Sequence, residues 1–393
     1  MDAKQGARER LAAAEADLRA LSRRIHAHPE LAFEEERAAG WVADALDAAG
    51  FRVERGICDV PTAFVARAGS GPLHVAICAE YDALPDIGHA CGHNLIAALA
   101  VGAGIAAAHV ADEAGLTVSV VGTPAEESGG GKIVLLERGA FAGVHAAMMV
   151  HPAPFDMVEP PTLAFSEFVA HFHGKASHAS AAPELGINAG DALVVAQTAI
   201  GLLRQHIRPT DRVHGIVTRG GEAPNIIPAH TTGRYYVRAR TLGDLEDIRG
   251  KVLRCFEAGA LATGCTLRVD DSSAPYAEVR HDSALAALYR ANAEALGRTF
   301  IDSRPGMSRF AGSTDMGNVS HAMPSIHPMI GLSCLPAVNH QPEFTAHCVG
   351  PAADRVLLDG ALALAWTAVD VATDDVLSAR LRAGPATGAT GAR

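Results

Sequence analysis

Metal-capable side chains follow three apolar runs of the sequence, at the point where each run ends. They are Glu80, Asp82, His89, Cys91 and His93 after the first run, Glu126 and Glu127 after the second, and His151 after the third. Thiolate, imidazole and carboxylate ligands together suit Zn²⁺, and the carboxylates also admit Mn²⁺, Co²⁺ or Ni²⁺. The sequence therefore indicates a divalent metal centre built from separate segments.

The three runs, 73–78, 116–121 and 146–150, have the length and composition of buried parallel strands. In open α/β sheets ligands bind at the carboxyl ends of the strands, so these side chains are expected to converge. Four of them are enough for one ion: Cys91, His93, Glu127 and His151. A second ion needs a further ligand, and the candidate is His340 in the segment NHQPEF.

The adjacent glutamates Glu126 and Glu127 can take two different catalytic roles. One can bind a metal while the other takes the proton of an activated water and passes it to a leaving amine. Two neighbouring carboxylates also raise the pKa of one of them unless a cation compensates the charge. The pair is a second indication of metal-assisted hydrolysis.

Each feature has an ordinary structural explanation when it is taken alone. Cys91 close to His93 could be incidental, the glutamate pair could belong to a solvated loop, and His151 could be a hydrogen-bonded histidine at a strand end. Together these explanations require three coincidences at three strand ends. We therefore expect the metal centre.

Charge and composition exclude several other classes. The 393 residues include 33 Lys and Arg against 44 Asp and Glu, which gives a net charge of −11. The sequence contains no cluster of basic residues of the kind that binds nucleic acid. Residues 1–10 are polar and charged, and no uninterrupted apolar run reaches the length of a membrane span. The seven cysteines are irregularly spaced, which indicates free thiols. We expect a cytoplasmic protein without a membrane partner.

The apolar periodicity predicts the elements that position the site. Strand-like runs alternate with expected helices at 8–28, 35–49, 95–111 and 132–138, and Asn94 is expected to cap the third helix. This order predicts an α/β fold with helices on both faces of a mostly parallel sheet. Helices expected at 283–296 and 361–371 continue that pattern.

The middle of the chain follows a different pattern. Alternating runs at 166–173, 212–218, 231–239 and 266–270, with helices at 189–206 and 242–258, predict an inserted α+β domain with one open sheet face. The expected organisation is a catalytic domain over 1–162 and 276–380, an inserted lid and dimerisation domain over 163–275, and a frayed tail over 381–393.

Seven motifs carry a resemblance to a known family. They are GHACGHN (88–94), TPAEESGGGK (123–132), VHP (150–152), GKASHAS (174–180), APNIIP (223–228), GSTDMGNVS (312–320) and NHQPEF (339–344). They resemble the amidohydrolase branch of the aminoacylase/carboxypeptidase G metallopeptidase family, which includes hippurate, indole-acetyl-amino-acid and p-aminobenzoyl-glutamate hydrolases. The match runs in order from His28 to Phe344.

The resemblance implies a role for each candidate residue. Cys91 would bridge two divalent ions, with His93 and His151 on one and Glu127 and His340 on the other. Glu126 would be the general base. In the inserted domain, His178 would stabilise the oxyanion in the active site of a partner subunit, which implies a homodimer, while Asn225 and Arg238 would contact the substrate.

Three positions refine this picture. The carboxypeptidase-like branch places a metal-binding His where Glu80 stands, and more familiar amidohydrolases carry Asp in place of Asn94. Asp82 is then expected to orient a metal ligand and not to bind the metal itself.

The predicted function is metal-dependent hydrolysis of the amide bond in a small N-acyl amino acid or dipeptide. One alternative is a non-catalytic metal- or ligand-binding paralogue of the same fold. Another is a thiol hydrolase that uses Cys91 as nucleophile and His93 as base.

Overall fold

The computed structural model describes residues 2–302 and 312–384 and divides into two compact units. Of the described residues, the first comprises 2–161, 279–302 and 314–384, and the second comprises 162–278 with 312 and 313. The predicted insertion at 163–275 lies within the second unit. Of the predicted tail, residues 385–393 lie outside the described residues, whereas Leu381 and Arg382 complete helix α12 (Asp375–Arg382).

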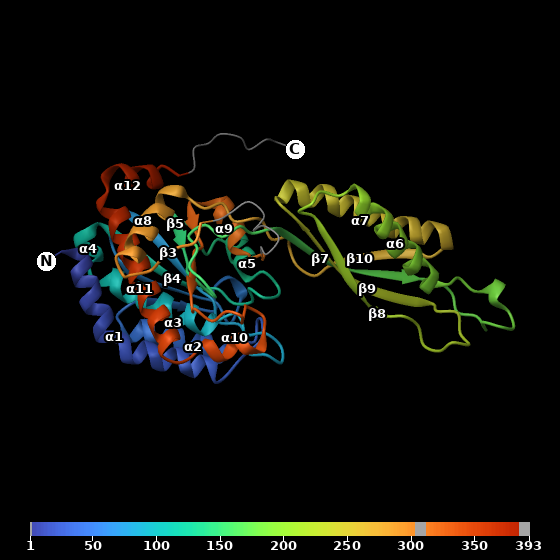
Figure 1. The fold of residues 1–393 in the computed structure, drawn as a ribbon, viewed down its shortest axis with the longest axis horizontal. Helices are drawn as coiled ribbons and strands as arrows, with labels where there is room; N and C mark the ends of the chain where they lie inside the picture. The colour runs from blue at the N-terminus through green and yellow to red at the C-terminus, as the bar shows by residue number, and fades with distance from the viewer. Residues whose placement is uncertain (1, 303–311, 385–393) are drawn as a thin grey trace. The chain divides into compact units, whose positions relative to one another are not determined.

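The first unit contains a six-stranded sheet in the order β1-β2-β4-β3-β5-β11. Its central strands β3, β4 and β5 are labelled in Figure 1. Its strands are β1 (Arg52–Arg55), β2 (Phe64–Gly69), β3 (Leu73–Ala79), β4 (Leu116–Gly122), β5 (Ala146–Met148) and β11 (Ser325–Ile326). β4, β3, β5 and β11 run parallel to one another, while β1 and β2 extend the β4 edge antiparallel. The mostly parallel sheet is confirmed.

Helices cover both faces of this sheet. Alternate residues of a strand point to opposite faces, so each strand contributes side chains to two cores. Val75 and Ile77 of β3 pack in the large core beneath the long helices, whereas Ala76 and Cys78 pack in a smaller core on the other face. The helices that contribute to the large core are α1 (Ala3–His26), α2 (Glu36–Ala48), α3 (His93–His109), α8 (Ser283–Glu294), α11 (Pro351–Thr373) and α12, with the short α4 (Ala111–Ala114) and α10 (Pro342–His347). α5 (Gly131–Glu137) and α9 (Met316–Ala322) contribute to the smaller core.

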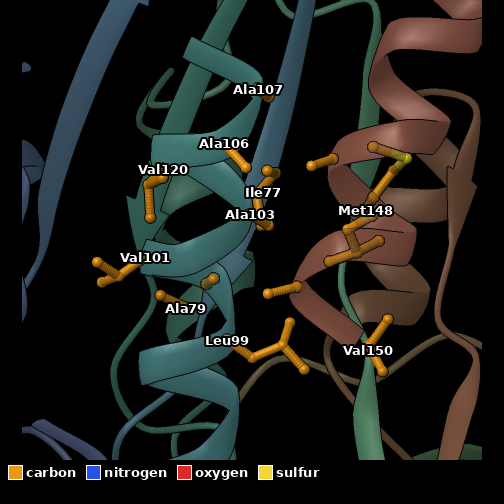
Figure 2. Close-up of a cluster of buried hydrophobic side chains, with 14 of the residues drawn as sticks. Ile77, Ala79, Leu99, Val101, Ala103, Ala106, Ala107, Val120, Met148 and Val150 are labelled. Atoms are coloured by element: carbon orange, nitrogen blue, oxygen red, sulfur yellow. The ribbon is translucent and has the colours of Figure 1, made fainter. Parts of the chain in front are cut away.

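Helix α3 is buried on every side, between the sheet and helices α1 and α11. Figure 2 shows its residues Leu99, Ala103 and Ala106 beside side chains of the sheet. The small residues permit this close packing: a Cβ on Gly104 would lie 2.5 Å from Val120 Cγ2 of β4. The helix can therefore carry the metal-binding loop at its N-terminus on a fixed base.

Helix α11 is longer than the predicted segment 361–371 and starts at Pro351. Among the helices in the described residues, it is long and apolar enough to span a membrane by length and composition. However, 72% of its most apolar 18-residue window is buried inside the fold. It serves here as a core helix against α3.

The prediction that Asn94 caps α3 is wrong. The helix begins at His93, and its N-cap is Gly92, with φ at 81°. Asn94 lies inside the helix, fully buried, and its amide donates hydrogen bonds to Ser22 Oγ and to the Cys348 carbonyl, both at 2.9 Å. Asn94 therefore ties α3 to α1 and to the segment after α10 (Pro342–His347).

The second unit is a four-stranded antiparallel sheet with two helices. The strand order is β10-β7-β9-β8, with β7 (Ala164–His173), β8 (Arg212–Arg219), β9 (His230–Ala239) and β10 (Thr266–Asp271). Figure 1 shows α6 (Ala189–Leu203) and α7 (Leu242–Thr263) along one side of this sheet. Phe168, Ala170 and Phe172 of β7 pack in one core with these helices. The alternate residues of β7, among them His171 and His173, lie on the opposite face.

Candidate metal centre

The loop after β3 brings a thiol and an imidazole to the carboxyl end of the sheet. Gly92 takes a left-handed conformation, and a Cβ there would lie 3.1 Å from the Pro152 side chain, so the loop can turn only at a residue without one. Cys91 precedes this turn and His93 opens helix α3. Both side chains are buried.

A tight turn after β4 presents the two glutamates. Ala125 has a positive φ of 59°, and its N–H donates to Glu35 Oε1 at 2.8 Å. Gly131 closes the turn, because a Cβ there would lie 1.8 Å from the Pro124 carbonyl oxygen. Glu127 is fixed further, since its N–H donates to Asp82 Oδ2 at 2.9 Å.

His93 lies at the centre of the cluster. Its Nδ1 lies 2.9 Å from Asp82 Oδ1, so the ring donates there and turns Nε2 away from Asp82. Burial lowers the pKa of His93, but the charge and hydrogen bond of Asp82 outweigh it and raise this pKa well above its usual value, so a metal ion would take the place of the proton on Nε2. Nε2 has no hydrogen-bond partner within residues 2–302 and 312–384. It lies 3.4 Å from Glu80 Oε2, 3.8 Å from Glu127 Oε1 and 3.9 Å from Glu126 Oε2.

His151 and His340 approach from two other segments. His151 opens β6 (His151–Ala153), which pairs with β12 (Met329–Gly331); its Nδ1 lies 2.8 Å from the Pro152 carbonyl, and its Nε2 lies 3.4 Å from Cys91 Sγ. His340 has a φ of 67°, and its N–H donates to the Ala90 carbonyl. Its Nε2 lies 3.3 Å from Glu127 Oε1.

The ligand atoms form three overlapping groups in which all atoms lie within 4.8 Å of one another. The groups are Cys91, His93 and His151; Cys91, Glu127 and His340; and Glu80, His93 and Glu126. Cys91 belongs to two of them, and so does His93. All the metal and base candidates that the sequence placed in the first unit therefore meet in one place, with Asp82 behind His93.

The charges at this site are poorly balanced without a cation. Burial, together with the charges of Glu80 and Glu127, raises the pKa of Glu126 well above its usual value. Burial and the charge of Glu127 also raise the pKa of the Cys91 thiol. The pKa of Glu127 is lowered, because its interactions with His340 and His93 outweigh burial. Divalent ions would compensate the carboxylates and favour a Cys91 thiolate.

Lys132 neutralises Glu80 and Asp315, two carboxylates whose role the sequence did not explain. Its Nζ lies 2.5 Å from Glu80 Oε1 and 2.7 Å from Asp315 Oδ1, and all three side chains are fully buried. The Lys132 N–H also donates to Asp315 Oδ2. Glu80 is therefore held by an ion pair at the position where the carboxypeptidase-like branch has a ligand.

We expect Lys132→Met to lower the free energy of unfolding of the first unit by about 3–5 kcal/mol, because it leaves two buried carboxylates without their cation. Urea denaturation at neutral pH measures this loss. The matched control is Arg52→Met, which breaks an exposed ion pair with Glu54 and should cost less than about 1 kcal/mol. Equal effects of the two substitutions would contradict the role given to Lys132.

The other predicted site residues lie in the second unit. His178 and Asn225 are neighbours, since the Ala179 N–H donates to the Asn225 carbonyl. His178 Nδ1 accepts from the Ala181 N–H at 3.1 Å, which leaves its Nε2–H on an exposed side chain as a donor. Arg238 lies near the C-terminal end of β9. It donates to Ser313 Oγ and lies over the Phe165 ring.

Asn339, like the ion pair of Lys132, was not predicted from the sequence. The Asn339 amide donates to the Pro152 carbonyl at 3.1 Å and lies 3.9 Å from Cys91 Sγ. The sequence feature that could have identified Asn339 is its position directly before His340 in the segment NHQPEF.

Comparison with known proteins identifies the family. The sequence model of peptidase family M20/M25/M40 matches residues 76–357. The chain belongs to this family. The resemblance to the amidohydrolase branch of these metallopeptidases is confirmed, and the protein is a metallo-hydrolase.

Among the curated relatives, Xaa-Arg dipeptidase of Mus musculus is 43% identical over 383 residues, which cover 94% of this chain and 88% of the relative. A chain of the p-aminobenzoyl-glutamate hydrolase of Escherichia coli is 36% identical over 272 residues, covering 63% of this chain and 56% of the relative. The fold is also that of a dinuclear metal binding peptidase of Bacillus subtilis, with a TM-score of 0.70 and 22% identity over 92% of this chain and 99% of that one.

Proposed function

We propose that the protein hydrolyses the amide bond of a dipeptide or small N-acyl amino acid with the help of two divalent metal ions. One observation carries the proposal. The Asp82-oriented imidazole of His93 directs an unpartnered Nε2 toward a buried cluster of carboxylates, within the part of the chain that the structure describes. Such an arrangement suits metal-assisted hydrolysis.

The donor groups support a two-ion arrangement. Cys91, His93 and His151 would hold one ion, Cys91, Glu127 and His340 would hold the other, and the thiolate would be shared. Asp82 and the Pro152 carbonyl fix the tautomers of His93 and His151, so that each ring offers Nε2 to the ion. The mixed set of ligands is compatible with Zn²⁺, Mn²⁺, Co²⁺ or Ni²⁺.

Ions held by these residues would supply Lewis acidity to the scissile carbonyl and to the attacking water. Glu126 takes the proton of that water and delivers it to the leaving amine. The buried position of Glu126 and the nearby Glu80 and Glu127 raise its pKa, which suits a group that must accept a proton and release it again.

His178 would act in the active site of a second copy of the chain. Its exposed Nε2–H is available to donate to the oxyanion, and it lies beside Asn225, which would contact the substrate together with Arg238. A homodimer through the second unit is supported by apolar side chains exposed on strand β8, at the edge of the sheet, and on helix α6. They are Ile216, Val217, Val194 and Leu202.

The substrate class rests on the relatives' activities and is part of the proposal. By their names, Xaa-Arg dipeptidase acts on dipeptides and p-aminobenzoyl-glutamate hydrolase acts on an aryl-acyl amino acid, so these two classes are the first substrates to test. A cytoplasmic location is supported by the seven free thiols.

Chelation provides the test of this function. We expect full-length protein loaded with Zn²⁺ or Mn²⁺ to release free amine from members of a panel of Xaa-Arg dipeptides and aryl-acyl amino acids. A chelator should abolish the release, and added metal should restore it. No turnover by fully loaded protein would favour the non-catalytic paralogue. Activity that resists chelation but is lost on thiol alkylation would favour Cys91 as nucleophile.

A further inference from the structure

Three histidines gather on the open sheet face of the second unit, away from the helices α6 and α7. His171 and His173 belong to β7, and His230 pairs directly with His173 across the β7–β9 ladder. One ring nitrogen from each lies within 4.8 Å of the other two. None of the three is needed for the chemistry proposed above. We propose that they bind one divalent transition-metal ion, a site separate from the catalytic ligands.

The nitrogens of His171 and His230 already lie at a suitable separation. His171 Nδ1 lies 3.3 Å from His230 Nε2. Two imidazole nitrogens at about 2.0–2.1 Å from a tetrahedral Zn²⁺ are about 3.3 Å apart. The ring planes are 14° from parallel, so the spacing of the two nitrogens suits a shared ion but the rings must turn to direct both lone pairs at it.

Asp270 of β10 prepares His171 for this role. Its Oδ2 lies 3.2 Å from His171 Nε2, so His171 donates there and keeps the lone pair on Nδ1, the atom that faces His230. A carboxylate behind a ligating histidine is the usual arrangement at zinc sites.

His173 supplies the third ligand by rotation. Its ring stacks on that of His230, with centroids 4.4 Å apart and planes 9° from parallel. Parallel rings cannot direct their lone pairs at one point, so the exposed His173 ring must turn about its side-chain bonds. Water would complete the coordination.

Two arginines stand beside the cluster, and each has an acidic partner. Arg219 is paired with Glu222, and Arg268 lies 3.0 Å from Asp270. Arg219 also lies 3.0 Å from His230 Nδ1, where it stabilises the tautomer that carries the proton on Nε2. Metal binding needs the other tautomer, so Arg219 competes with the ion.

The experiment compares metal stoichiometry in variants of the full-length protein. After equilibrium dialysis against Zn²⁺, we expect elemental analysis to find one equivalent per chain less in His173→Ala than in the wild type. His214→Ala removes another histidine of the same sheet, on β8, and should keep the extra equivalent. Because the ion would link β7 to β9, Zn²⁺ should also raise the Tm of the wild type more than that of His173→Ala.

Arg219→Ala gives the opposite change. Removal of the competing guanidinium should tighten binding of the extra Zn²⁺ about tenfold, measured by competition with a metal indicator. Equal zinc stoichiometry in wild type and His173→Ala would overturn the proposal, and so would unchanged or weaker binding in Arg219→Ala. Neither result depends on turnover, so the outcome is independent of the proposed hydrolase activity.

Discussion

Replacing Glu126 with Gln is expected to lower kcat about 10²–10⁴-fold without loss of bound metal. The amide has nearly the same shape as the carboxylate but cannot accept the proton of the attacking water. Glu126 is not one of the four side chains that would hold ions together with Cys91. Steady-state kinetics and elemental analysis of the same protein sample measure the two quantities.

The adjacent glutamate is the matched control. Glu127→Gln is expected to lower metal occupancy, because Glu127 Oε1 lies in the group with Cys91 and His340. The pair of variants thus separates proton transfer from metal binding at neighbouring positions. Near-normal kcat in Glu126→Gln with full metal occupancy would refute the assignment of the base.

His178→Ala is expected to lower kcat about 10²–10³-fold, the usual loss when one oxyanion donor is removed. The side chain is exposed, so the substitution should leave folding intact. If His178 serves the partner's active site, mixing this variant with Glu126→Gln should restore activity in hybrid dimers. Random exchange of subunits predicts recovery of about one quarter of wild-type activity.

Mixing Glu126→Gln with Glu127→Gln controls for this experiment. Glu126 and Glu127 of one chain belong to the same active site, so each site of a hybrid dimer carries one of the two substitutions. No site is intact, and activity should not recover. Mass spectrometry of differently labelled subunits verifies the exchange. Failure of the His178→Ala mixture to recover after verified exchange would show that the active site is not shared.

The convergence of the first-unit ligands could be predicted because it depends on strands with a clear sequence signal. The apolar runs that become β3, β4 and β5 are continuous, and the carboxyl ends of parallel strands lie on one edge. Strands β1 and β11 were missed for different reasons. β1 is short and charged (RVER), and β11 has only two residues, so neither carries an apolar periodicity.

Other features depend on contacts that local sequence does not encode. Asn94 was expected to cap α3, but the left-handed Gly92 starts the helix earlier and turns Asn94 into the core. The ion pair of Lys132 joins residues 183 apart in the chain. Likewise, the distance between His171 and His230 follows from strand register, which the alternating pattern of each strand alone does not determine.

The contact between α3 and α11 has a consequence for the synthesis of the protein. Helix α3 is complete at residue 109, but the helix that covers one of its apolar sides begins only at residue 351. Until then the nascent chain carries an uncovered apolar surface, which favours aggregation of unfinished chains. Chains that end before residue 351 are therefore expected to be insoluble, whereas the full-length chain covers this surface itself.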